Sequence, residues 1–534
     1  MARPGFVHEV DERTPPLLVH SGGDFVTERF PLGTKVIYPA DPVPTAGDPS
    51  DLIARALAAP VGSAPLAQRL RPGMRLTITF TDVSAPLPRM RRPDVRGQVI
   101  EQVLALAAAA GVDDVALVAA TGLNRRLTDD ELAWILDERV MRSFASTDDG
   151  PDAGLTCHDA ENPQGLVTVG ATESGREVQI NRRVAESDLV VHVVAATTVS
   201  PAAHQFTQAG GWDSVLTGLG SAGTLAARFG YQLDDSSGHH GDQAKLAAEL
   251  AGVVAEHVPV FTVEAALNNA VFGPTTALLG RREWDWGLRD RLGFVALRRA
   301  LALAPHRSRE RIFSRANAPY GVMSVAAGDP AQANQLTSAA LLDQLRVPVT
   351  GQTDVLVTGV GQLSPFSVDS TPNPLVAAAM AAQAVARHTE EGPLVKPGGA
   401  LIVYHPATPA PAGRLQPATP DFWTDVLGRT RDSATMADRF EPTFAADPWY
   451  RHLYRTSNAY HALQPFHLWY SLDSLRLQVS DVIWVGADRS SVEQLGFRAA
   501  STLADALEMV STQVGRTPSI GYLHAPPHPW VDVT

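Results

Sequence analysis

Residues 75–119 decide the fold class of this chain. Residues 75–80 read Arg-Leu-Thr-Ile-Thr-Phe, an alternation of apolar and β-branched residues that is typical of a strand. Residues 94–110 have helical periodicity, and residues 114–119, Asp-Val-Ala-Leu-Val-Ala, predict a second strand. Strands joined through a helix lie parallel in one sheet. Further strands are expected at residues 189–195, 354–358, 400–405 and 482–486. We therefore predict an α/β protein with mainly parallel sheets flanked by helices.

Length and composition are those of an ordinary globular protein. The chain has 534 residues, of which 45% are hydrophobic and 19% are charged, enough for two or three domains. Its net charge of −13 argues against nucleic acid as a partner, because phosphate contacts need a basic surface. A single cysteine, Cys157, excludes an intrachain disulfide and a thiolate metal cluster. The sequence contains neither a signal peptide nor an apolar span of 18 residues, so we expect a soluble cytoplasmic protein.

Polar residues follow several of the expected strands. In open parallel sheets the ligand site lies beyond the carboxyl ends of the strands, which singles out Asp82, Asn124, Asn373 and His405. A purely structural role is the alternative: Asp82 can cap the turn that follows it, and Asn124 can satisfy loop backbone groups. A polar cleft at this edge favours a small-molecule ligand.

Four segments match, in the same order along the chain, sequence motifs of one enzyme family. Residues 60–63, Pro-Val-Gly-Ser, parallel a Pro-Ile-Gly-Ser, and residues 81–88, Thr-Asp-Val-Ser-Ala-Pro-Leu-Pro, parallel Asp-His-Thr-Arg-Pro-Val-Pro. Residues 120–125, Ala-Thr-Gly-Leu-Asn-Arg, parallel Ala-Thr-Gly-Phe-His-Arg. Residues 211–216, Gly-Trp-Asp-Ser-Val-Leu, parallel Gly-Gly-Arg-Lys-Ser-Val-Leu-Pro-Gly. On these segments the chain resembles the nickel-pincer lactate racemase family, in which that lysine carries a nickel cofactor derived from nicotinic acid.

The resemblance implies two domains and a cleft between them. Residues 1–265 would form a lactate racemase-like N-terminal domain, and residues 266–534 would form a C-terminal α/β domain. An arginine-rich helical insertion is expected at about residues 279–315.

The family's cofactor residues are replaced here. The lysine corresponds to Asp213, whose carboxylate cannot form the amide-type bond, and the nickel-ligating histidine corresponds to Phe229. The nickel-pincer nucleotide is the cofactor that the resemblance implies, but these two positions predict neither a covalent pincer nor a metal site. The carboxylate-binding arginine corresponds to Ala85, and a late lysine near the substrate falls roughly at Ala377.

The acid/base residues are partly kept. One acid/base histidine corresponds to Asn124, whose amide cannot exchange a proton near neutral pH. Asp82 is retained, and His204 is the counterpart of the second histidine if the alignment shifts by one residue. We predict that Asp82 and His204 are the catalytic pair. The predicted substrate-binding residues are Ser84, Asn124, Arg125, Asp213 and Asn373.

Two other clusters contain histidine. Residues 239–242, His-His-Gly-Asp, offer metal ligands, although adjacent histidines in a Ser/Gly-rich loop more often face solvent. Residues 449–470 are dense in aromatic residues and include Tyr454, Arg455, His461 and His467, the best acid/base group of the C-terminal half. The alternative for this second segment is a core or a domain interface.

The insertion at residues 279–315 holds ten arginines among leucine, phenylalanine and tryptophan. A basic amphipathic helix can dock on a partner or on an anionic membrane. It can equally pack on the chain's own acidic surface or at a homo-oligomer interface.

Three functions from different classes remain open. The first is an isomerase-like enzyme, a racemase or epimerase, that acts on a small hydroxy acid without the covalent pincer. The second is a non-catalytic small-molecule-binding or regulatory protein that kept the cleft. The third is a partner-binding scaffold that uses residues 279–315. We favour the first.

Overall fold

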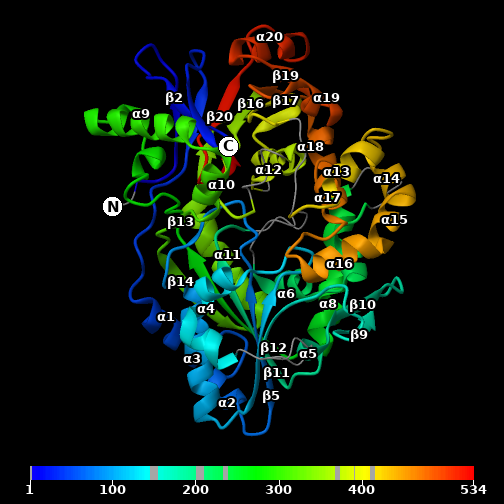
Figure 1. The fold of residues 1–534 in the computed structure, drawn as a ribbon. Coiled ribbons are helices and arrows are strands. Elements are labelled where there is room, and N and C mark those ends of the chain that lie inside the picture. The colour runs from blue at the N-terminus through cyan, green and yellow to red at the C-terminus, as the bar shows by residue number, and fades with distance from the viewer. Residues whose placement is uncertain are drawn as a thin grey trace.

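The computed structural model describes residues 3–144, 154–199, 210–231, 239–366, 373–389, 391–408 and 415–534, without the side chains of residues 239–243 and 306–307. The elements form two lobes, each built around one large sheet (Figure 1).

The first lobe is built on a six-stranded sheet of order β14-β12-β11-β5-β7-β8. Its parallel strands are β5 (Arg75–Thr81), β7 (Asp114–Ala120), β8 (Leu155–Cys157), β11 (Leu189–Ala196) and β12 (Val260–Leu267), and β14 (Val322–Gly328) is antiparallel to β12. Every residue of β11 and β12 is buried, because helices cover both faces. One face packs on α1 (Pro49–Ala58), α3 (Val95–Ala109) and α4 (Asp129–Phe144), and the other on α6 (Gly211–Leu219) and α8 (His239–His257).

The second lobe is built on a seven-stranded sheet of order β1-β4-β20-β16-β17-β18-β19. The strands are β1 (Phe6–Glu9), β4 (Lys35–Tyr38), β16 (Thr353–Gly359), β17 (Val395–Tyr404), β18 (Val479–Val485), β19 (Arg498–Ala500) and β20 (Ile520–Leu523). They are parallel except for β1, which is antiparallel to β4. The α/β class with mainly parallel sheets is confirmed.

Each of the two sheets contains strands from both sides of residue 265. Strands β1 and β4 come from the first 40 residues but complete the second sheet, whereas β12 spans residue 265 and β14 follows it, yet both belong to the first sheet. A single boundary at residue 265 therefore does not describe the sheets. Strand pairing is set by which open edge a strand can complete, and that edge can belong to chain hundreds of residues away.

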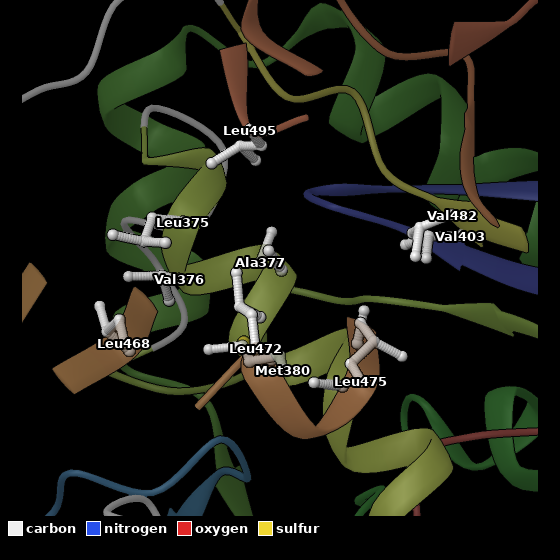
Figure 2. Close-up of a cluster of buried hydrophobic side chains, with 14 of the residues drawn as sticks. Leu375, Val376, Ala377, Met380, Val403, Leu468, Leu472, Leu475, Val482 and Leu495 are labelled. Atoms are coloured by element: carbon white, nitrogen blue, oxygen red, sulfur yellow. The ribbon is translucent and has the colours of Figure 1, made fainter. Parts of the chain in front are cut away.

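The core of the second lobe is centred on α12 (Pro374–Ala386). Nearly all of its residues are buried, and α17 (Gln464–Tyr470) and α18 (Asp473–Gln478) pack against it. Figure 2 shows Ala377 and Met380 of α12 among Leu468, Leu472 and Leu475. The opposite face of the sheet is covered by α20 (Leu503–Val514).

The arginine-rich insertion packs on the N-terminal hairpin of β2 (Leu17–Ser21) and β3 (Asp24–Glu28). It forms α9 (Leu288–Leu303) and α10 (His306–Ser314), with 3₁₀ turns at Ala277–Gly280 and Glu283–Asp285, and Figure 1 shows α9 at the side of the molecule beside β2. Buried Glu283 accepts hydrogen bonds from the backbone N–H of Leu18 (2.7 Å) and the Tyr38 hydroxyl (2.9 Å). The outer face of α9 leaves Leu288 and Leu292 exposed. Docking of a partner on that face remains a prediction.

One of the remaining elements, α11 (Pro330–Leu345), is a 16-residue helix that packs against β12 and β14 of the first sheet, and the others are shorter. These others are α2 (Leu66–Arg69), α5 (Arg182–Ala185), α7 (Ala222–Phe229), α13 (Thr419–Asp421), η4 (Phe422–Val426), α14 (Ser433–Arg439), α15 (Glu441–Ala446), α16 (Pro448–Thr456), α19 (Arg489–Gln494), β6 (Arg89–Met90), β9 (Leu166–Ala171), β10 (Glu177–Asn181), β13 (Asn317–Ala318), β15 (Arg346–Val349) and β21 (Trp530–Val533). None of the helices in the described part of the chain is long and apolar enough to cross a bilayer.

Candidate functional site

The carboxyl ends of β5 and β7 bring Asp82 and Asn124 together. Asp82 is buried, and its two carboxylate oxygens are held separately: Oδ1 accepts the backbone N–H of Ser84 (3.0 Å), and Oδ2 accepts the Asn124 side-chain amide (3.1 Å). Burial raises the pKa of Asp82 against the hydrogen bonds and the nearby charge of Arg125, which lower it. The turn-capping role and the pairing with Asn124 therefore coexist on one carboxylate.

A buried ion pair fixes the backbone at the end of β5. The Arg96 guanidinium donates to the carbonyl oxygens of Thr81 (2.5 Å) and Asp82 (2.7 Å). Asp94 accepts two hydrogen bonds from the same guanidinium, at 2.9 and 2.7 Å, and both side chains are buried. Arg96 acts here as a positioning residue for Asp82.

Arg125 is engaged within its own lobe. Its guanidinium forms a two-point pair with the Glu131 carboxylate, at 2.8 and 2.6 Å, and both groups are buried. Thr128 donates to the same carboxylate through its backbone N–H (2.9 Å). The charge of Arg125 is thus compensated inside the protein, which weakens its predicted role as a substrate anchor.

The Gly210-Gly211 turn is clamped by Glu264 of β12. The backbone N–H of Gly211, at the start of α6, donates to Glu264 Oε1 (2.7 Å), and Asn334 donates to Oε2 (3.3 Å). Glu264 is fully buried, and burial raises its pKa from 4.5 to about 7 despite these hydrogen bonds. A Cβ atom at Gly210 would lie 2.0 Å from Glu264 Oε2, so the turn requires glycine there.

Residues 449–470 clamp the loop after β7 from the second lobe. The Tyr454 hydroxyl donates to the Gly122 carbonyl (2.7 Å) and accepts the Ala160 N–H (3.2 Å). The backbone N–H of His461 donates to the Leu123 carbonyl (3.1 Å), and its ring Nε2 lies 2.8 Å from Glu161 Oε1. These contacts make the segment an interface between the lobes, which was the alternative to an independent acid/base group.

The chain resembles known proteins in sequence family and in fold. Residues 29–239 match the protein-family model described as the lactate racemase N-terminal domain. This part of the chain belongs to the lactate racemase N-terminal domain family. The lactate racemase apoprotein structure from Thermoanaerobacterium thermosaccharolyticum matches with a TM-score of 0.62 and 14% identity, covering 97% of this chain and 100% of that chain. The fold is therefore that of lactate racemase over nearly the whole length.

A Thermotoga maritima protein solved by structural genomics matches with a TM-score of 0.46 and 12% identity, covering 91% of this chain and 99% of that chain. No curated protein matches.

The described residues at the two cofactor positions of this lactate racemase-like chain do not fit the nickel pincer. Asp213 forms a two-point pair with buried Arg228, at 2.9 and 3.1 Å, so the lysine position carries a compensated carboxylate. Phe229 presents a ring that packs 5.7 Å from the ring of His467. Within the described residues no three His, Cys, Asp or Glu side chains are grouped so that they could hold a metal ion.

His467 is buried beside this position without a hydrogen-bond partner on either ring nitrogen. Burial lowers its pKa to about 3, so the imidazole is neutral. Its ring packs against Phe229 across the two lobes, and the nearby His461 also lowers its pKa.

The predicted residues of the second lobe have structural partners. Asn373 is fully buried and caps α12: Oδ1 accepts the Leu375 N–H (3.2 Å), and the amide donates to Gln416 and Thr419. Ala377 lies inside the core shown in Figure 2 and cannot reach a ligand. His405 is buried against Trp484, and its pKa is lowered to about 3 by burial.

Arg387, at the end of α12, is a candidate that the sequence analysis missed. Its side chain is buried, it donates to Gln383 (3.0 Å), and burial lowers its pKa to about 10. Its backbone carbonyl bonds Val531, and the adjacent Trp530 packs on the carboxyl end of β11. A signal was present, because Gln383 and Arg387 interrupt an otherwise apolar helical run.

Several predicted residues cannot be placed. His204 lies outside the described residues, and the side chains of His239, His240 and Asp242 lie outside the described part of α8. The pairing of Asp82 with His204 therefore remains a prediction.

Proposed function

We propose that this lactate racemase-like protein is an isomerase, of the racemase or epimerase type, that acts on a small hydroxy acid beyond the carboxyl end of β5 without a lysine-linked cofactor. The observation that carries the proposal is the buried Asp82–Asn124 pair at the ends of adjacent parallel strands. This is the position at which open parallel sheets hold their ligands.

Asp82 is the proposed proton acceptor. A general base works best when its pKa lies near the operating pH, and burial moves the pKa of Asp82 in that direction. In the proposed step the C–H bond next to the substrate carboxylate breaks, its proton passes to Asp82, and its electron pair forms an enediolate. A second acid on the opposite face returns a proton to carbon, and the sequence assigns that role to His204. Asp82 then releases its proton to water, and the second acid takes a proton from water, so that both groups return to their starting states.

Arg387 is the proposed anchor for the substrate carboxylate. Arg125 is compensated by Glu131, so its charge is less available to a ligand. Arg387 is buried, and among the described residues no carboxylate lies within ion-pair distance of it. Burying a guanidinium without a counter-ion costs free energy, and a bound anion would offset that cost.

The test is solvent exchange. Protein in D₂O is incubated with a panel of 2-hydroxy acids, and deuterium at carbon 2 is followed by NMR. We expect incorporation with wild type, a loss of about 10²–10⁴-fold with Asp82→Asn, and no change with Asp51→Asn, an exposed aspartate of α1. No incorporation with any acid and wild-type protein would refute the isomerase proposal.

The second candidate is a ligand-binding or regulatory protein. It is favoured by the amide of Asn124, which holds Asp82 but cannot transfer a proton. Stabilisation by a hydroxy acid in a thermal shift assay, without deuterium incorporation, would select this function over the first.

A further inference from the structure

We propose that the pocket between α16 and β8 is a second binding site, specific for a small phosphate-bearing anion. The pocket has a volume of about 540 Å³, within the range of small-molecule sites. Residues from both lobes line it, among them Arg126, Asn162 and Cys157 from the first lobe and Arg451, His452 and Arg455 from the second. Nothing in the proposed isomerase chemistry uses these residues, so the two proposals stand or fall separately.

Positive charge is in excess in this pocket. Arg455 pairs with Asp159 (2.8 Å), and Arg451 pairs with Glu161 (3.2 Å), so two of the three guanidiniums have a carboxylate. Arg126 donates to the Arg455 carbonyl (2.8 Å), and none of the described carboxylates forms an ion pair with it. A local cation excess on a chain of net charge −13 is selective for an anion.

Arginine chemistry points to phosphate rather than to a simple halide. The planar guanidinium matches the geometry of phosphate oxygens and can donate two parallel hydrogen bonds. The side chains of Arg451 and Arg455 remain 46% and 41% exposed, so their free N–H groups can reach a ligand without breaking the existing pairs. A dianion between Arg126 and these two residues would be held from both lobes.

Binding of an anion in this pocket would change how firmly the Asp82 carboxylate is held. Arg126 lies two residues beyond Asn124, which holds the Asp82 carboxylate. Arg455 follows Tyr454, whose hydroxyl binds the Gly122 carbonyl in the same loop. An anion that joins Arg126 to α16 therefore tightens the loop that positions Asn124. Binding at this site acts on the junction between the lobes, and its regulatory consequence, unlike binding itself, rests on the proposed function.

The alkylation rate of Cys157 can report whether the pocket is occupied. Cys157 is the single cysteine of the sequence, lines the pocket and is partly exposed. Burial raises the pKa of its thiol, so alkylation will be slow and readily timed. The experiment follows the rate of iodoacetamide addition by intact mass, in inorganic phosphate, in a sugar monophosphate, and in sodium chloride of equal ionic strength.

We expect either phosphate species to slow alkylation at least threefold relative to chloride. Protection by inorganic phosphate identifies free phosphate as sufficient, and protection by the sugar monophosphate alone identifies an organic phosphate. Arg126→Gln should abolish the protection, whereas Arg291→Gln, an exposed arginine of α9, and Asp82→Asn should keep it. Equal rates in all three salts, or protection that persists in Arg126→Gln, would overturn the proposal.

Discussion

Replacement of Glu264 by glutamine should change how the stability of this protein depends on pH. The carboxyl is fully buried, and its pKa in the folded protein is raised from 4.5 to about 7. Between these two values the folded state keeps the proton while the unfolded state releases it. Stability contributed by the neutral carboxyl is therefore complete below pH 4.5 and is lost as the pH rises through 7. At about 1.4 kcal/mol per pH unit, the shift corresponds to a loss of about 3 kcal/mol.

Glu264→Gln is uncharged at every pH, and its carbonyl oxygen can still accept the Gly211 N–H. The free energy of unfolding of the variant, relative to wild type, should therefore rise by about 3 kcal/mol between pH 4.5 and pH 7.5. Urea unfolding at pH 4.5, 5.5, 6.5 and 7.5 measures the difference, with Glu256→Gln on the exposed side of α8 as the control. A difference between variant and wild type that stays constant to within about 1 kcal/mol across this range would refute the reasoning.

Three further predictions concern the junction and the proposed anchor. Gly122 has a φ of +52°, and a Cβ there would lie 2.1 Å from the Thr217 carbonyl oxygen. Gly175 has a φ of +81°, but no atom lies within 4 Å of a Cβ at that position. Gly122→Ala should therefore lower the unfolding temperature far more than Gly175→Ala. Tyr454→Phe leaves the Gly122 carbonyl without its donor and should cost about 1–3 kcal/mol in thermal unfolding. Arg387→Met should leave the unfolding temperature unchanged or higher, and should abolish any hydroxy-acid-dependent thermal shift.

The strands could be predicted because their signal is local. A strand covered on both faces needs a continuous apolar run, and residues 189–195 were expected where β11 spans Leu189–Ala196. The meeting of Asp82 with Asn124 could be predicted for the same reason, since the carboxyl ends of neighbouring parallel strands share one edge. The exchange of β1 and β4 into the second sheet could not, because β4 pairs with β20 nearly 500 residues away.

The partners of the site residues were harder to predict than their positions. Nothing in the loop after β7 distinguishes an arginine that binds a ligand from one that is paired with Glu131, six residues later. Asn373 did carry a readable signal: an asparagine directly before Pro374 is typical of a helix start, and its side chain does cap α12. This capping pattern is a stronger signal than the position of Asn373 after a strand, because β16 ends at Gly359.

The loop at residues 121–126 connects the Asp82 site to both lobes. Gly122 is held by the second lobe, Asn124 holds Asp82, and Arg126 faces the pocket beside α16. These hydrogen bonds join protein groups of the loop, of Asp82 and of the second lobe, and none of them uses the side chain of residue 213 or 229. Asp213 is paired with buried Arg228, so its carboxylate is compensated by a neighbouring protein group. A site whose shape depends on the junction of two lobes can be retained for another ligand, and can be regulated from the far side of the same junction.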